Sequence, residues 1–519
     1  MDEVTTLAFF FLSYCGIVHG GITSLCSQTP YPKLCNSLIP IKPDKETIAD
    51  TNIFSFRNTA LRVTLAQAQN AHKEILSMNI SSLSEQGKLV WADCLELSED
   101  TLYHLNRSIT YSNTNDAQTW LSAAMANRQT CLNGFHDFEL SSYLEKFPFV
   151  VGDFSKYLCN SLAINKATTT LSTKHQPKGR RLSQAFPEWL SVSDRRKLLQ
   201  TSKGAHIVVA QDGSGNYKSI SEALAAAKIM RKGMERFVIY VKRGVYKENV
   251  KIKTSMKNLM FIGDGIDATI ITGERNVHDG STTFRSATFA VSGAGFIAKG
   301  ITFENTAGPQ KHQAVALLSG SDFSVFYRCS FKGYQDTLYV HSHRQFYRDC
   351  DIHGTVDFIF GDAVAVFQNC NIFVRKPMRN QKNTITAQGR SSPDENTGII
   401  IHSSRITAAS DLRHVQGSFK TYLGRPWKQY SRTLFIKCTI DNLIDPVGWL
   451  PWSGEFALKT LYYGEYMNTG VGAGTRNRVK WPGYHVITNV MEAEKFSVGN
   501  FLTGDSWLPV TKVPYTSSL

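Results

Sequence analysis

The chain has 519 residues, of which 42% are hydrophobic, enough to fill the cores of two or three domains. Its formal net charge of +14 favours an acidic partner, which is a nucleic acid, an anionic membrane or an anionic polysaccharide. The sequence contains no RNA-recognition, helix-turn-helix or zinc-finger pattern, and this disfavours nucleic acid.

The first residues predict a signal peptide over 1–20. Residues 7–18, LAFFFLSYCGIV, form an apolar run of signal-peptide length that is too short to span a bilayer. Val18 and Gly20 suit the positions before a cleavage site, but acidic residues replace the usual positive start, and a buried N-terminal strand is the alternative. No later segment is apolar enough to cross a membrane, so we expect a secreted, extracellular protein without a membrane partner.

Residues 21–171 are expected to form a four-helix bundle. Apolar residues recur there at helical spacing in four segments with short connections, which is typical of an up-and-down bundle. The predicted helices are 48–76, 91–112, 116–138 and 150–168.

Secretion makes the cysteines of this region candidates for disulfides. Cys94 and Cys131 lie on the second and third predicted helices, which a bridge between them would join. Cys26 and Cys35 flank a short turn-rich loop and are candidates as well. Two N-glycosylation sequons begin at Asn79 and Asn106.

Residues 172–203 are basic, polar and without periodicity, and they predict a linker. The basic clusters Arg180-Arg181 and Arg195–Lys197 are either a solvated charge run or processing sites, with a cut expected near Leu199. Residues 204–519 then change to short β-prone segments separated by Gly, Asn and Asp.

A short motif with an apolar residue on either side of a Cys, Ser or Ile recurs in this second region. Its central positions are Ile301, Cys329, Cys350, Cys370, Ser404 and Cys438. A repeat of roughly 20 residues with variable insertions is typical of a parallel β-helix, in which each repeat forms one coil. Few hairpin turns are present, and a β-sandwich would require them.

Two aspartates occupy the same position in consecutive repeats. Asp336 lies seven residues after Cys329, and Asp357 lies seven residues after Cys350. Stacked parallel strands are about 4.8 Å apart, so we expect the two carboxylates to lie side by side at a common groove. The same geometry places Cys350 beside Cys370, within reach of a disulfide.

Two carboxylates about 5 Å apart repel by about 3 kcal/mol at an effective dielectric constant of 20. One should therefore be ionised and the other protonated near neutral pH, which provides a nucleophile or base beside an acid. A structural pair or a calcium site is the alternative.

His341 and His343 lack partners at metal-ligand spacing, so we expect them to be solvated or to flank a substrate.

Further polar residues fit such a site. Gln313 and Gln335 are neutral amide donors that can stabilise an oxyanion without forming salt bridges to the carboxylates. Arg425 is suited to keep one aspartate ionised, and Trp427 offers a flat apolar surface to a sugar ring.

With these residues the sequence resembles plant pectin methylesterase. The resemblance rests on five motifs in order, GVYKE, QAVAL, QDTL, DFIFG and LGRPW, which begin at Gly244, Gln313, Gln335, Asp357 and Leu423. The N-terminal region, with its four cysteines, resembles the pectin methylesterase and invertase inhibitor domain that precedes many plant forms.

The resemblance implies a right-handed parallel β-helix that hydrolyses the methyl esters of polygalacturonate, the polymer of pectin, to pectate and methanol. It implies that Asp357 is the nucleophile, and that Asp336 acts first as general acid and then as base. Gln335 would stabilise the oxyanion with help from Gln313, and Arg425 would orient Asp357. The resemblance also places Thr283, Gln313, Arg425 and Trp427 in contact with the substrate, and it implies no metal or organic cofactor.

Other functions fit part of this pattern. A glycoside hydrolase on a β-helix also uses paired carboxylates, and a pectate lyase would need clustered acidic calcium ligands, which the sequence lacks near Arg425. A serine esterase is disfavoured because no G-x-S-x-G motif occurs. From a different class, the chain could act as an inhibitor through its N-terminal bundle.

The expected partners are methyl-esterified homogalacturonan of the cell wall, inhibitor proteins and processing proteases. We also expect the bundle to restrain the Asp336/Asp357 site until the linker is cut.

Overall fold

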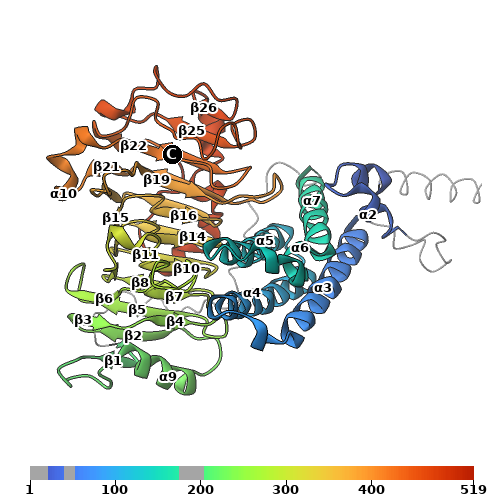
Figure 1. Cartoon of the computed structure of the whole chain (residues 1–519), viewed down its shortest axis with the longest axis horizontal. Coiled ribbons are helices and arrows are strands. Elements are labelled where there is room, and N and C mark those ends of the chain that lie inside the picture. Colours follow the sequence, from blue (N-terminus) through green and yellow to red (C-terminus); the bar gives the residue numbers. More distant parts are fainter. Residues whose placement is uncertain (1–21, 40–52, 175–203) are drawn as a thin grey trace, which may run out of the picture. The chain divides into compact units, whose positions relative to one another are not determined.

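The computed structural model describes residues 22–39, 53–174 and 204–519. It forms two compact units, which are considered one at a time (Figure 1). Of the described residues, 22–39, 53–174 and Ser392–Asn396 belong to the first unit, and 204–391 and 397–519 belong to the second. The predicted signal peptide and most of the predicted linker lie outside the described residues. Within those residues, no helix is long and apolar enough to cross a membrane.

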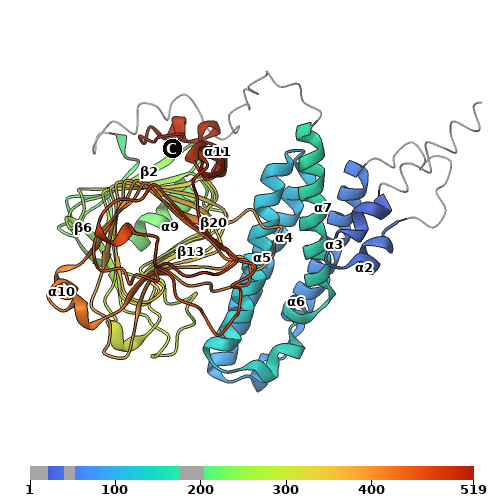
Figure 2. The ribbon, with the colours of Figure 1, turned by 90° about the horizontal axis from the view of Figure 1, so that it is seen from above.

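The first unit is helical, as predicted, and four long helices dominate it (Figure 2). Its helices are α2 (Pro32–Asn36), α3 (Ile53–Ser77), α4 (Glu85–Thr110), α5 (Thr114–Asp137), α6 (Pro148–Val151) and α7 (Asp153–Lys174). Helix α4 begins six residues before the predicted start because the Ser84 side chain accepts the Gly87 N–H and caps it. Cys26 is bonded to Cys35, and Cys94 on α4 is bonded to Cys131 on α5, as predicted.

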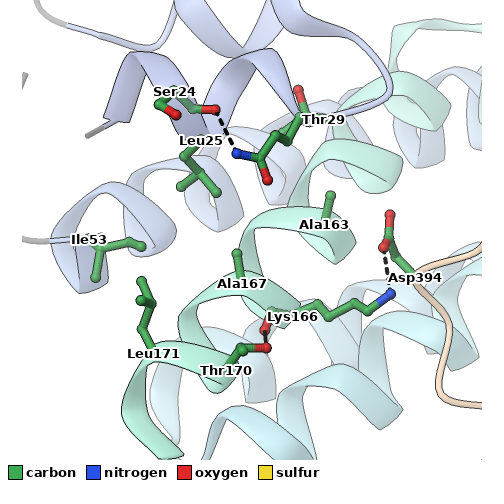
Figure 3. Close-up of a pocket in the computed structure, with 11 residues that line it drawn as sticks. Ser24, Leu25, Thr29, Ile53, Ala163, Lys166, Ala167, Thr170, Leu171 and Asp394 are labelled. Carbon is green, nitrogen blue, oxygen red and sulfur yellow. Dashed lines mark hydrogen bonds and ion pairs between the residues drawn. The ribbon is translucent and has the colours of Figure 1, made fainter. Parts of the chain in front are cut away.

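A cavity of about 450 Å³ opens in this unit between the helical turn at residues 22–27 and helix α7 (Figure 3). Leu25, Ala163 and Ala167 contribute apolar surface, and the Lys166 side chain also lines it. Ile53, the first described residue after the gap at 40–52, lies at the same cavity.

The second unit consists of parallel strands in three sheets, which form a parallel β-helix. The eleven-stranded sheet contains β1 (Ile207–Val209), β2 (Phe237–Val241), β5 (Leu259–Gly263), β8 (Ile297–Lys299), β11 (Ser324–Tyr327), β14 (Arg344–Arg348), β17 (Val364–Gln368), β20 (Gly398–His402), β23 (Arg432–Ile436), β25 (Tyr462–Tyr466) and β26 (Tyr484–Val486). The seven-stranded sheet contains β4 (Val250–Ile252), β7 (Phe289–Val291), β10 (Leu317–Ser319), β13 (Leu338–Val340), β16 (Ile359–Gly361), β19 (Asn383–Gln388) and β22 (Thr421–Gly424). The eight-stranded sheet contains β3 (Gly244–Lys247), β6 (Thr269–Gly273), β9 (Thr302–Asn305), β12 (Ser330–Lys332), β15 (Asp351–Gly354), β18 (Asn371–Val374), β21 (Arg405–Ala408) and β24 (Thr439–Ile440).

Each coil from β2 to β22 contributes one strand to each sheet, and Figure 2 shows the coils wound about a common axis. Strands β11, β12 and β13 form one coil, and β14, β15 and β16 form the next. The central residues of the sequence repeat are all buried, as a repeat that fills the interior requires: Ile301, Cys329, Cys350, Cys370, Ser404 and Cys438.

Aromatic side chains stack through the interior along the same axis. Tyr347 lies between Phe326 and Phe367, with ring centroids 4.8 Å and 4.4 Å away, at the spacing of neighbouring strands. Helix α9 (Ile220–Met230) contributes buried residues to this core and begins with the capping box of Ser219 and Glu222.

A second apolar cluster covers the outer face of the eleven-stranded sheet. Val325 and Phe346 of the sheet pack in one cluster with Leu502 and Trp507 of the C-terminal segment. The short helices of the chain after β21 are α10 (Ser410–Arg413), α11 (Val490–Glu494) and α12 (Val498–Phe501).

The predicted disulfide between Cys350 and Cys370 is wrong, because both residues are free thiols in the structure. In-register parallel neighbours project their side chains in the same direction about 4.8 Å apart, which exceeds the usual Cβ–Cβ separation of a disulfide. The thiols instead donate to backbone carbonyls, Cys350 to Phe326 at 3.3 Å and Cys370 to Tyr347 at 3.7 Å. Burial raises the pKa of the Cys350 thiol well above its usual value.

This arrangement predicts the thiol content of the denatured protein. Cys159, Cys329, Cys350, Cys370 and Cys438 should all be alkylated in denaturant without a reducing agent, because none of them is bonded to another cysteine. Peptide mass spectrometry identifies the alkylated positions. Recovery of a peptide pair joined through Cys350 and Cys370 would contradict the structure.

Candidate active site

Asp336 and Asp357 lie at equivalent positions on consecutive coils. Each precedes a strand of the seven-stranded sheet by two residues, and the strands pair with Leu338 opposite Ile359. The Asp336 N–H donates to the Val356 carbonyl at 3.0 Å, so the same register extends back to the aspartates. The two residues are therefore one strand spacing apart, about 4.8 Å.

Both aspartates have a left-handed backbone, with φ of 61° at Asp336 and 50° at Asp357. Among residues with a side chain, Asp and Asn accept this conformation most readily. This left-handed backbone bends the chain just before Leu338 and Ile359, whose side chains face the interior. The usual alternation of side chains between the two faces of a strand is interrupted there. The bend lets the two carboxylates leave the core, and both remain buried, at 8% and 5% exposure.

Arg425 holds the Asp357 carboxylate with both arms of its guanidinium group. Its Nε donates to Oδ1 at 2.9 Å, and its Nη2 donates to Oδ2 at 2.6 Å. Arg425 directly follows β22, two coils beyond Asp357. Such a bidentate pair fixes the orientation of the carboxylate.

Thr384 on β19 makes two further contacts with Asp357. Its hydroxyl accepts the Asp357 N–H at 2.9 Å and donates to Oδ1 at 2.6 Å. Because the backbone N–H occupies a lone pair, the hydroxyl proton is directed at the carboxylate. Thr384 thus fixes the side chain of Asp357 relative to its own backbone.

The ion pair with Asp357 acts on the pKa of Arg425. Burial alone lowers the pKa of its guanidinium, but the charge and hydrogen bonds of Asp357 raise it above the ordinary value. Arg425 also lies over the Trp452 ring at 4.4 Å. The guanidinium is therefore charged, and it lies within electrostatic reach of both acids.

Gln313 and Gln335 lie on neighbouring coils beside the aspartates. The Gln335 carbonyl accepts the Ala314 N–H at 3.2 Å, and the Gln313 carbonyl accepts the Val277 N–H at 3.0 Å, so the backbone fixes both residues. Both side chains are partly exposed, and among the described residues neither amide group has a hydrogen-bond partner. Two amide donors are thus available to a ligand.

The outer face of the seven-stranded sheet carries an aromatic cluster beside these residues. Tyr339 and Phe360 stack with ring centroids 4.2 Å apart, and Trp427 contacts both rings edge-on at 6.4 Å and 5.8 Å. We call Tyr339, Phe360 and Trp427 the aromatic face.

Thr283 is partly exposed in the turn before β7, where its carbonyl accepts the Ser286 hydroxyl at 2.8 Å.

His341 and His343 are only 4% and 3% exposed, so the prediction that they are solvated is wrong, while the alternative that they flank a substrate stays a prediction. Burial, followed by the neighbouring His343, lowers the pKa of His341 to about 3, so its imidazole is neutral. In the described parts of the chain, no group of three or more His, Cys, Asp or Glu residues is placed to hold a metal ion.

Sequence reasoning missed Thr384 and Trp452. Thr384 lies one coil beyond Asp357, but β19 pairs with β16 across an insertion, with Ile359 opposite Thr386, so the usual repeat length does not locate it. Trp452 lies in a segment without strands after β24, where no repeat places it beside Arg425.

Comparisons with known proteins cover nearly the whole chain. A family model described as Pectinesterase matches residues 206–505, and one described as Plant invertase/pectin methylesterase inhibitor matches residues 21–164. The Arabidopsis thaliana protein named Probable pectinesterase/pectinesterase inhibitor 6 is 55% identical over 532 residues, which covers 96% of this chain and 94% of that protein. Pectinesterase 2 of Citrus sinensis is 52% identical over 523 residues, 99% of this chain and 98% of that protein. The solved structure of pectin methylesterase from carrot has a TM-score of 0.60 and 58% identity, and the match covers 62% of this chain and all 100% of that chain.

The double contact of Thr384 predicts a measurable effect on stability. Thr384→Val keeps the side-chain shape but removes the hydrogen bond to a buried carboxylate, which should lower the free energy of unfolding by about 1–3 kcal/mol. Thr384→Ser retains the hydroxyl and is the matched control, with a smaller loss. Guanidinium unfolding followed by tryptophan fluorescence compares the variants, and equal stabilities of the Val and Ser variants would contradict the assigned role.

Proposed function

We propose that this chain, which belongs to the pectinesterase family and is a carboxylic ester hydrolase acting on pectin, uses Asp357 as its nucleophile and Asp336 as its general acid and base. The observation that carries the proposal is the Arg425–Asp357 ion pair, set one strand spacing from Asp336. The ester bond is that between galacturonate and methanol, so the products are pectate and methanol.

In the first step the ionised Asp357 attacks the ester carbonyl carbon. Its oxygen forms a bond to that carbon, and the carbonyl electron pair moves onto oxygen to give a tetrahedral oxyanion. A carboxylate is a weak nucleophile, so this charge needs strong stabilisation. The amide N–H groups of Gln335 and Gln313 are suited to donate to the oxyanion, since no described residue occupies them.

In the second step the oxyanion collapses and methanol leaves. The protonated Asp336 donates its proton to the methoxy oxygen as the C–O bond breaks, and an anhydride between Asp357 and the galacturonate remains. The resulting Asp336 carboxylate then takes a proton from water, which attacks the galacturonate carbonyl and regenerates Asp357. Each aspartate thus returns to its starting protonation state.

The remaining site residues bind the polymer. Within the aromatic face, Trp427 is partly exposed and offers apolar surface to a sugar ring, while the buried Tyr339 and Phe360 support it from the sheet. Arg425 orients Asp357, and its partly exposed side chain can also contact substrate. Thr283 lies in the turn that precedes the same sheet. The proposed reaction requires no cofactor.

The proposal extends to location and partners. A secreted enzyme with a signal peptide at 1–20 would act in the cell wall on methyl-esterified homogalacturonan, to which its net charge of +14 would attract it. The N-terminal unit, which matches the inhibitor family, supports inhibitor proteins as partners. The basic clusters of the linker are candidate cleavage sites for processing proteases. Asn79 and Asn106 are both exposed and remain proposed glycosylation sites.

Asparagine substitutions test the roles of the two acids. Asp336→Asn should lower the rate of methanol release from methylated pectin by about 10²–10⁴-fold, the usual contribution of a general acid. Asp357→Asn removes the nucleophile and should lower the rate at least as much. Asp351→Asn is the matched control, because Asp351 lies on the eight-stranded sheet in contact with Asn371.

The same assay separates the proposal from its alternatives when viscosity is followed in parallel. An esterase releases methanol without shortening the polymer, whereas a glycoside hydrolase or a lyase lowers the viscosity. Chain shortening that depends on Asp357, or wild-type methanol release by Asp357→Asn, would overturn the proposal.

A further inference from the structure

Gln335 and Asp336 lie in one turn, residues 333–337, between strands β12 and β13. The next coil holds Asp336 directly, because the Asp336 N–H donates to the Val356 carbonyl at 3.0 Å. The backbone of Gln335 is bonded through its carbonyl, which accepts the Ala314 N–H at 3.2 Å, while its N–H has no partner among the described residues. The position of the Gln335 amide group therefore depends also on the two residues that precede it in the turn.

Arg375, which directly follows β18, contacts both of those residues. Its Nη1 donates to the Gly333 carbonyl at 3.0 Å, and its Nη2 donates to the Tyr334 hydroxyl at 2.6 Å. The guanidinium also lies over the Tyr334 ring, 3.8 Å from the ring centre. One planar group thus fixes the backbone at Gly333 and the side chain of Tyr334 at the same time.

Further contacts fix Arg375 itself. Its backbone N–H donates to the Gly354 carbonyl at 2.7 Å. Its Nε pairs with Asp411 of α10 at 3.4 Å, and the same carboxylate accepts the Lys376 N–H at 3.3 Å. The Arg375 side chain is 26% exposed, so water competes only partly for these hydrogen bonds. The guanidinium is therefore held between α10 and the turn that carries Gln335.

We propose that Arg375 is a positioning residue for the reaction, which holds the amide group of Gln335 at the oxyanion through Gly333 and Tyr334. This inference rests on the proposed function, in which the Gln335 amide donates to the oxyanion. Such a donor is effective only at about 2.7–3.1 Å from the oxyanion, so a small displacement of the turn lowers the rate. Because the oxyanion exists only after attack on the ester, the displacement leaves binding of the substrate unchanged.

The test is a double-mutant cycle between Arg375→Met and Gln335→Ala in the full-length chain, with methanol release from methylated pectin as the assay. Arg375→Met alone should lower kcat about tenfold, a part of the about 10²–10³-fold that loss of an oxyanion donor costs, and should leave KM unchanged. In the Gln335→Ala background the same substitution should lower kcat no further, because no amide group remains to be positioned. A loss of stability alone would lower kcat equally in both backgrounds.

Two further variants complete the test. Tyr334→Phe removes one of the two acceptors of the Arg375 guanidinium but keeps the ring beneath it, and it should lower kcat about threefold, again only when Gln335 is present. Arg405→Met is the matched control, because Arg405 on β21 also pairs with an aspartate, Asp441 at 3.2 Å, but contacts no residue of the site. It should keep the wild-type kcat.

The pH profile of kcat should keep its wild-type inflections in Arg375→Met, since Arg375 acts through the turn and not through its charge on the two acids. A shifted inflection, a rise of KM at unchanged kcat, or the same fall of kcat with and without Gln335 overturns the inference, as does an equal fall of kcat in Arg405→Met. Failure of the proposed function is distinct, because Gln335→Ala alone would then keep the wild-type kcat.

Discussion

The hydrogen-bonded register between successive coils is the constraint on which the rest of this site depends. Leu338 pairs with Ile359, and Ile359 pairs with Thr386, so residues far apart in sequence take equivalent places on neighbouring coils. Side chains of a strand alternate between faces, so a slip of one residue would exchange the buried and exposed sets. The stacked interior rings of Phe326, Tyr347 and Phe367 make such a slip costly.

Four coils contribute to one carboxylate environment through this register. Asp336, Asp357 and Thr384 come from three consecutive coils, and Arg425 follows a strand of the next. Asp336 and Asp357 have the same place on the coil and the same left-handed backbone, but Arg425 grips Asp357. The ion pair therefore distinguishes the two aspartates, and the proposed roles of nucleophile for Asp357 and general acid for Asp336 rest on this difference.

The sequence predicted those parts of the fold that follow from regular repeats. The buried residues Ile301, Cys329 and Cys350 recur at a spacing that indicates coils, and the aspartates inherit that spacing. The sequence did not predict the contact of Thr384 with Asp357, because an insertion lengthens the coil that contains Thr384. It did not predict the burial of His341 either, because apolar periodicity does not encode local bends of the chain. The predicted Cys350–Cys370 bridge failed because proximity of two coils does not turn the sulfur atoms toward each other.

A covalent intermediate on Asp357 is the most direct test of the account. A galacturonate ester of nitrophenol needs no acid for departure of its leaving group, but the second half of the reaction still needs Asp336 as base. With Asp336→Asn we predict a burst of one equivalent of nitrophenol, and mass spectrometry after acid quenching should find the galacturonyl group on the peptide that contains Asp357. Release without a burst, or a galacturonyl group attached to any other residue, would contradict the account.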